Sequence, residues 1–130
     1  MQISVIKKTL LLSTLLFAAS VACAEWVKAT QSKESTFYID PATIRKNGSL
    51  RTVWGIQDLR QRHPSGYMSV RSRWEFDCKN ERINLMSTTN HSEPMAGGEE
   101  LKRSQWQDRD WADIAPESVS DAILKIVCAN

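Results

Sequence analysis

Histidine is scarce in this chain, whose 130 residues include only His63 and His91. Neither histidine stands at a spacing from Cys, Asp or Glu that is typical of a metal site. The serines and threonines lack a nucleophile-elbow sequence, and Gly97-Gly98 is too short for a phosphate-binding loop. We therefore predict a protein that is not an enzyme and that has neither metal nor cofactor. A small hydrolase that uses one of the histidines is the weakest alternative.

The sequence also lacks a hydrophobic run long enough to cross a membrane. Its most apolar stretch, Leu10 to Ala19, is about half of the ~20 residues that a membrane span requires. Two lysines precede this stretch and small residues follow it up to Ala24, which is the pattern of an export signal. We predict a signal peptide over residues 1–24, cleavage after Ala24, and a single mature domain over residues 25–130 without a membrane span.

Cys23, next to the predicted cleavage site, leaves a second kind of export open. In the sequence Ser20-Val21-Ala22-Cys23 this cysteine can become a lipid-modified N-terminus that holds the domain on a membrane. Ser20, however, stands where such signals usually carry leucine. We expect ordinary cleavage, with a lipid anchor at Cys23 as the alternative.

Cysteine is as scarce as histidine, because removal of the signal leaves only Cys78 and Cys128 of the three in the chain. Two thiols in an exported domain are typical of one disulfide rather than of thiol chemistry. A bridge between them closes a loop of 50 residues. The chain-entropy model values such a loop at about 4 kcal/mol, a large share of a small domain's stability.

Net charge is low as well. Without the two lysines of the signal, the basic residues of the mature chain equal its 15 acidic ones. The first half is basic and the second half acidic, so the two either compensate each other in the fold or make a dipolar molecule. Compensation is the simpler interpretation, and we expect no nucleic-acid partner.

What the mature chain does have is hydrophobic spacing of period two, interrupted by turn residues, which predicts an antiparallel sheet. The predicted strands cover residues 26–29, 36–39, 50–59, 68–78, 82–89 and 99–105. Asp40 and Pro41 predict a short capped helical turn after the second strand. Residues 92–98, with one proline and two glycines, predict a mobile loop.

The last segment changes to helical spacing. Ser118 and Asp121 form a start that resembles a capping box, and the predicted apolar face follows on one side. This face comprises Val119, Ala122, Ile123, Ile126 and Val127. Cys128 flanks that face, whereas Cys78 has the parity of the core side of its strand. We therefore predict an α+β fold in which a C-terminal helix covers the sheet and the disulfide clamps the helix end to it.

Arginines on the predicted solvent-exposed face of the sheet are the first candidate binding residues. Arg71 and Arg73 share the solvent parity of their strand, and Arg51 has like parity on the neighbouring one. Such a basic stripe can engage sulfated glycans or acidic protein segments. A solvated sheet face without a ligand is the simpler interpretation.

The tryptophans divide into two groups. Trp26, Trp54 and Trp74 are core candidates by parity, whereas Trp106 and Trp111 flank a charged loop. If either of the last two is exposed, it marks a contact site, because exposed aromatic residues dominate many protein interfaces.

An ordered set of short motifs then spans nearly the whole mature chain. It comprises Trp26, Tyr38-Ile39-Asp40, Ile44, Val53-Trp54, Phe76-Asp77-Cys78, Trp111, Ile114, Pro116 and Cys128. With this set the chain resembles the surface-adhesin protein E domain of Gram-negative bacteria. The resemblance implies a single curved antiparallel sheet of about six strands, packed by a C-terminal helix and tied by one disulfide between Cys78 and Cys128.

The same resemblance implies a place in the periplasm or on the outer cell surface, and binding of host proteins such as laminin, vitronectin and plasminogen. Every matching residue has the character of scaffold, so no ligand-binding residue is carried over. We predict an exported, non-enzymatic binding module whose partner is a host matrix or serum protein. The alternative is a periplasmic inhibitor or accessory protein that acts on an envelope partner.

Overall fold

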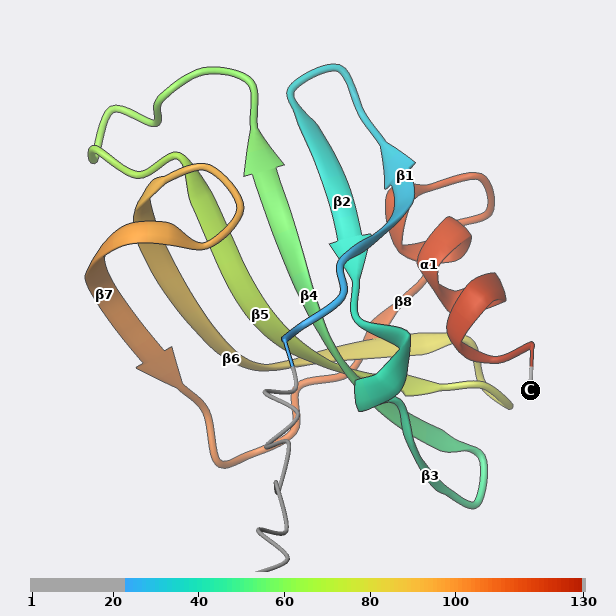
Figure 1. Cartoon of the computed structure of the whole chain (residues 1–130). Coiled ribbons are helices and arrows are strands. Elements are labelled where there is room, and N and C mark those ends of the chain that lie inside the picture. Colours follow the sequence, from blue (N-terminus) through green and yellow to red (C-terminus); the bar gives the residue numbers. More distant parts are fainter. Residues whose placement is uncertain (1–22, 130) are drawn as a thin grey trace, which may run out of the picture.

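The computed structural model describes residues 23–129, which form one antiparallel sheet and one C-terminal helix (Figure 1). The predicted signal peptide lies almost entirely outside the described residues. The eight strands are β1 (Val27–Gln31), β2 (Ser35–Ile39), β3 (Arg45–Asn47), β4 (Leu50–Leu59), β5 (Ser69–Asp77), β6 (Arg82–Glu93), β7 (Gly97–Gln105) and β8 (Ala112–Asp113).

Six of these strands follow one another across the sheet in the order β1-β2-β4-β5-β6-β7. All pairings are antiparallel, as predicted, and the sheet curls into a half-barrel with β7 at one side and β1 at the other (Figure 1). The short strands β3 and β8 were not predicted. They pair with the first residues of β4 and β6, so each is created by its partner rather than by its own sequence.

Side chains of neighbouring strands alternate between two faces of the sheet. Val53 of β4 pairs with Trp74 of β5, whereas the next residue, Trp54, pairs with Arg73. Directly paired residues share a face, because the pleat of adjacent strands is in phase. We call the side of Trp74 the helix face and the side of Arg73 the open face.

Helix α1 (Val119–Val127) packs on the helix face, next to β1 (Figure 1). Ser118 caps it as predicted, since its hydroxyl accepts a hydrogen bond from the Asp121 backbone N–H at 3.2 Å. The buried core joins both elements: it comprises Ile39, Val53, Trp74, Phe76, Ile123, Leu124 and Val127. The predicted apolar face is wrong at Ile126, which is 40% exposed. Leu124 takes its place, because the buried side of the helix is centred on Ile123, Leu124 and Val127.

The Cys78–Cys128 disulfide is present, with the two Cα atoms 5.8 Å apart. Cys78 follows the last residue of β5, and Cys128 is the C-cap of α1. The bridge therefore ties the end of the helix to the sheet that the helix covers, which confirms the predicted clamp.

Gly55 of β4 makes room for the largest core side chain. A Cβ atom at this position would lie only 2.1 Å from Cζ3 of the Trp74 ring. The indole therefore lies directly against the backbone of the adjacent strand, an approach that only glycine permits. The alternating pattern predicts a strand at Gly55, but no local signal indicates this contact.

The predicted mobile loop over residues 92–98 is wrong, because β6 and β7 extend into it and leave a three-residue turn. Met95 and Ala96 both adopt positive φ angles, of 56° and 57°. Their backbone N–H groups donate to Asp58 Oδ1 and Ser69 Oγ, each at 2.9 Å. Two side chains from strands that are distant in sequence thus hold the turn in a conformation that non-glycine residues rarely adopt.

The predicted cap before β3 is confirmed. Asp40 Oδ1 accepts a hydrogen bond from the Ala42 backbone N–H at 3.1 Å, and a short 3-10 turn follows over Pro41–Thr43. Within the part of the chain that the structure describes, no helix has the length and apolar character needed to cross a membrane.

Candidate functional site

The two histidines lie in different surroundings. The His63 ring stacks on Tyr67 with the ring centroids 4.3 Å apart, and its Nδ1 accepts a hydrogen bond from the Ser65 backbone N–H. His91 is buried on the open face, opposite Ser69 of β5. Among residues 23–129, no three His, Cys, Asp or Glu side chains gather in a way that would hold a metal ion.

His63 and Tyr67 line a hollow of about 520 Å³ at the loop end of the sheet, together with Leu59 and Arg60. No pattern in the sequence predicts a site there. The hollow forms only because β2 pairs with β4, which brings the loop after β4 next to the start of β2.

Arginines from two strands converge on the open face. Two rows of directly paired residues cross this face from β4 to β7. One row comprises Trp54, Arg73, Ser87 and Gln105, and the other comprises Ile56, Arg71, Thr89 and Arg103. Between these rows lies a groove of about 440 Å³. We call it the arginine groove; its walls are Trp54, Arg71, Arg73, Ser87, Thr88, Thr89, Arg103, Ser104 and Gln105.

The predicted stripe of three arginines is wrong at Arg51. This residue pairs with Phe76, which lies on the helix face, so Arg51 is on the other side of the sheet from Arg71 and Arg73. Its Nη1 donates to the carbonyl oxygens of Gly48 and Leu50 at 2.7 and 3.0 Å. Arg103 of β7 supplies the third cation of the groove instead.

Trp54 is not part of the hydrophobic core, contrary to the parity argument. It lies on the open face, and the Arg71 guanidinium carbon is 4.9 Å from the centre of its ring. This distance permits a cation–π interaction, which orients the guanidinium on the wall of the groove. Of the tryptophans predicted for the core, Trp74 belongs to it.

His91 lies next to the groove, because its pair with Ser69 is two pairs beyond Arg71 and Thr89 in the strand register and therefore on the same face. Burial, followed by the positive charge of Arg71, lowers the pKa of its imidazole, while the carboxylate of Glu100 opposes this effect. The ring is therefore held neutral beside a cationic surface.

The second candidate surface surrounds Trp106, which is 49% exposed. Its backbone N–H donates to the Met86 carbonyl oxygen at 3.1 Å, so its position relative to β6 is defined. A cleft of about 290 Å³ lies against it, lined by Asn84, Leu85, Trp106, Asp108 and Asp110. We call this the tryptophan cleft. Leu85 is itself 39% exposed, so the cleft combines two apolar side chains with two carboxylates.

Trp111 differs from Trp106, although both flank the same loop. Its ring contacts the guanidinium groups of both Arg82 and Arg109, whose central carbons are 4.9 and 5.8 Å from the ring centre. Trp111 is also more buried than Trp106. The structure therefore leaves Trp106 as the accessible member of the predicted pair.

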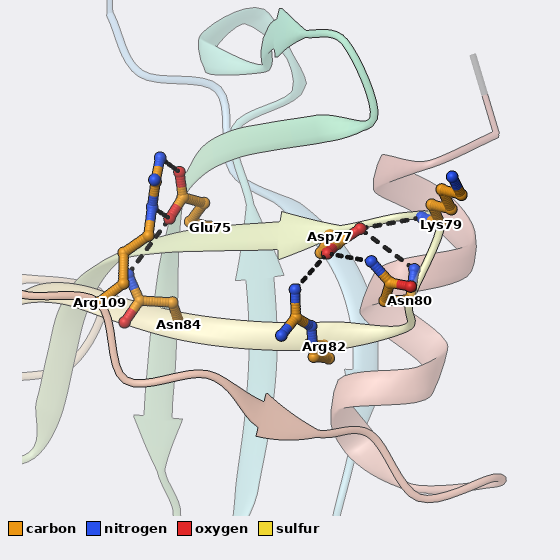
Figure 2. Close-up of polar contacts among 7 residues, drawn as sticks. All are labelled: Glu75, Asp77, Lys79, Asn80, Arg82, Asn84 and Arg109. Atoms are coloured by element: carbon orange, nitrogen blue, oxygen red, sulfur yellow. Dashed lines mark hydrogen bonds and ion pairs between the residues drawn. The ribbon is translucent and has the colours of Figure 1, made fainter.

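Figure 2 shows how the segment between Trp106 and Trp111 is fastened to the sheet. The buried carboxylate of Glu75 accepts hydrogen bonds from Arg109 Nε and Nη2 at 2.9 and 3.0 Å. Asn84 Oδ1 accepts a bond from the Asp110 backbone N–H at 3.0 Å. Bidentate pairs of this kind define orientation as well as distance. One wall of the tryptophan cleft is thereby held in place.

Asp77 closes the same end of the sheet (Figure 2). Its Oδ2 accepts hydrogen bonds from Arg82 Nη2 at 2.7 Å and from Asn80 Nδ2 at 2.9 Å. Its other oxygen accepts bonds from the Lys79 and Asn80 backbone N–H groups. The bond from Arg82, then that from Asn80, holds the pKa of Asp77 well below its usual range. Each partner is local, so this carboxylate is structural.

Comparison with known proteins identifies the family. The model of the family described as surface-adhesin protein E matches residues 26–129. This chain belongs to the surface-adhesin protein E family. Among curated protein sequences, none matches this member of the family.

Solved structures agree on the fold. Crystal form II of Haemophilus influenzae protein E is similar with a TM-score of 0.61 and 16% identity, over 82% of this chain and 89% of that one. A structure of protein E from non-typeable Haemophilus influenzae is similar with a TM-score of 0.60 and 18% identity, over 85% and 80% of the two chains. At such identities the likeness shows the fold alone.

Membership of the protein E family confirms the resemblance drawn from the short motifs and makes the chain an adhesin-like binding protein. The matching motifs include the core residues Ile39, Val53 and Phe76 and the disulfide cysteines. The arginine groove and the tryptophan cleft are described from the structure of this chain alone and not from any relative.

Proposed function

We propose that this protein is an exported, non-enzymatic binding module that holds a host matrix or serum protein through the tryptophan cleft. The observation that carries the proposal is the half-exposed indole of Trp106 beside an exposed Leu85. Large aromatic side chains that lose water on association supply much of the affinity of protein interfaces. The family name, surface-adhesin protein E, supports the choice of a host protein.

The hydrogen bonds around the cleft support this proposal. Glu75 binds Arg109, and Asn84 binds the backbone of Asp110. The loop is therefore attached to the sheet at the residues that directly follow Asp108. A surface that is already ordered loses little conformational entropy when a partner binds. Trp106 can therefore act as a rigid anchor.

The charges of the cleft indicate the chemistry of the partner. Asp108 and Asp110 both line it, and no basic side chain does. Complementarity favours a partner segment that carries Lys or Arg next to an apolar side chain. Rim charges of this kind mainly raise the association rate, so we expect binding to weaken as salt concentration rises.

Export is part of the proposal. The signal over residues 1–24, with cleavage after Ala24, would release the domain into the periplasm or to the outer surface of a Gram-negative cell. A lipid anchor at Cys23 would instead hold it on a membrane. Intact mass of the mature protein separates the two routes, because only the second adds a diacylglyceryl group.

The binding test uses the mature domain with its disulfide formed, on immobilised laminin, vitronectin and plasminogen. Substitution Trp106→Ala is expected to weaken binding by about 2 kcal/mol, roughly 30-fold in Kd. Ile126→Ala is the matched control, since this side chain is also exposed and apolar but lies on α1. Equal binding by Trp106→Ala and wild type, or no binding to any of the three proteins, would contradict the proposal.

A periplasmic inhibitor or accessory protein is the second candidate, because the same cleft can hold an envelope protein. Protease treatment of intact cells distinguishes the two locations. A surface adhesin is removed by the protease, whereas a periplasmic protein is protected by the outer membrane.

A further inference from the structure

The arginine groove is a second surface with a ligand chemistry of its own. We propose that it binds a sulfated saccharide, whose sulfate groups lie on Arg71 and Arg73 and whose hydroxyl groups meet the neutral walls. This inference goes beyond the proposed function, because it assigns a different ligand class to different residues on the open face of the sheet.

Charge is the first argument. Three guanidinium groups line the groove, and no carboxylate of residues 23–129 does. Within the same residues, the side chain of Arg73 makes no hydrogen bond or ion pair. Arg103 is shared with Glu100, whose Oε2 accepts a hydrogen bond from Arg103 Nε at 2.7 Å. The uncompensated positive charge of the groove is therefore concentrated at Arg71 and Arg73, where an anion gains most.

The orientation of Arg71 is the second argument. Its guanidinium packs over Trp54, and its Nε is buried without a hydrogen-bond partner. A protein acceptor would normally occupy such a donor, because an unsatisfied buried donor costs free energy. The guanidinium is instead held by packing alone, so none of its charge is neutralised within the described residues. A planar, preoriented guanidinium matches the geometry of sulfate oxygens.

The neutral walls decide between classes of polyanion. On the open face beside the arginines lie two hydroxyl groups and one amide, from Ser87, Thr89 and Gln105. Such groups can both donate to and accept from the hydroxyl groups of a sugar ring. An acidic peptide has only its backbone N–H and C=O groups for these positions, whereas a sugar ring carries several hydroxyl groups close together. The volume of about 440 Å³ is in the range of pockets that hold small ligands, so it suits one or two sugar rings rather than a folded domain.

The test measures binding of a heparin tetrasaccharide to the mature domain by calorimetry at low salt. Arg73→Gln is the main variant, because this side chain makes no hydrogen bond or ion pair within the described residues. We expect its affinity to fall at least about tenfold, since a hydrogen bond between charged groups is worth roughly 1.5–3 kcal/mol. Arg45→Gln removes the same charge from the exposed strand β3 and is expected to bind like wild type.

Two further ligands test the ligand class. The chemically desulfated tetrasaccharide is expected not to bind measurably. An oligoglutamate peptide of similar charge is expected to bind more weakly than the sulfated sugar.

Three outcomes would overturn the proposal. One is that the tetrasaccharide does not bind to the wild-type domain. Another is that Arg45→Gln weakens binding as much as Arg73→Gln, which would indicate attraction by net charge alone. The third is that the peptide binds as tightly as the sugar, which would make the groove a site for acidic protein segments. Because no protein partner is present in the assay, failure here is separate from failure of the tryptophan cleft.

Discussion

The two faces of the sheet use the same strands for opposite purposes. On β4 and β5, Val53, Trp74 and Phe76 point to the helix face, where α1 and the disulfide cover them. The alternate residues Trp54 and Arg73 point to the open face, which α1 does not cover. If the open face binds the saccharide that we propose, stability and recognition depend on alternate positions of one strand, so a substitution is expected to change either property almost alone.

The tryptophans of β4 and β5 show this division most directly. Trp74 is buried against the backbone at Gly55, and its whole ring belongs to the core. Trp54 pairs with Arg73, the residue before Trp74, and the Arg71 guanidinium packs on its ring instead. A tryptophan is thus a core residue on one face of the sheet, and a tryptophan on the other face supports a cation.

Removal of the disulfide tests the covered face most severely. The double substitution Cys78→Ser, Cys128→Ser is expected to lower the free energy of unfolding by about 4 kcal/mol, because the unfolded chain regains the entropy of the open loop. Denaturant titration of the variant and of the oxidised wild type measures the loss. A difference below about 1 kcal/mol would show that packing alone holds α1 on the sheet.

Substitution Gly55→Ala tests the contact beneath Trp74. We expect a loss of about 2 kcal/mol, because the new methyl group forces the indole out of place in a packed core. The control is the double variant Gly55→Ala, Trp74→Leu, in which the smaller side chain leaves room for the methyl group. The effects of the two single substitutions on stability should then add to more than the loss in the double variant. Simple additivity would contradict a direct clash.

His91 makes the open face sensitive to pH. Its pKa in the folded state is lowered by burial and by Arg71, so the unfolded chain binds a proton more readily. The stability that depends on neutral His91 is therefore present above about pH 6.5 and is lost as the pH falls. Chemical denaturation between pH 7.5 and pH 5 should show this decline in the wild type and a shallower one in His91→Gln. Identical slopes would contradict the assignment.

Arg73→Gln should have the smallest effect on folding. Its side chain has no hydrogen bond or ion pair within residues 23–129, so the free energy of unfolding is expected to change by less than about 0.5 kcal/mol. Thermal denaturation measures this value on the same samples that are used for saccharide binding. A clear loss of stability would show that the two faces are not independent.

Local signals explain why much of the fold was predictable. The period-two pattern identified β4 over its full length, Leu50–Leu59, and Ser118 marked the start of α1. The parity of Cys78 and the helical position of Cys128 indicated the bridge. Each of these signals lies within a few residues of the feature that it predicts.

Most of the errors concern contacts between distant segments. Arg51 was grouped with Arg71 because both follow an alternating pattern, but only the pairing of β4 with β5 decides which parities share a face. Arg103 was overlooked because β7 reaches the groove only after β6 has turned the chain back. The turn at Met95 and Ala96 depends on Asp58 and Ser69, which lie 37 and 27 residues earlier.

The sequence by itself determined the six longer strands and the helix of this protein E family member, its disulfide and the alternation of apolar and charged residues along the strands. Backbone propensity and hydrophobic period are local properties, so they can be recognised in the sequence without knowledge of the fold. The tertiary structure alone decided the strand register and the curl of the sheet, and with them which arginines meet at the groove and which tryptophan is exposed. Those outcomes depend on hydrogen bonds between strands that are far apart in the chain, and no local pattern specifies them.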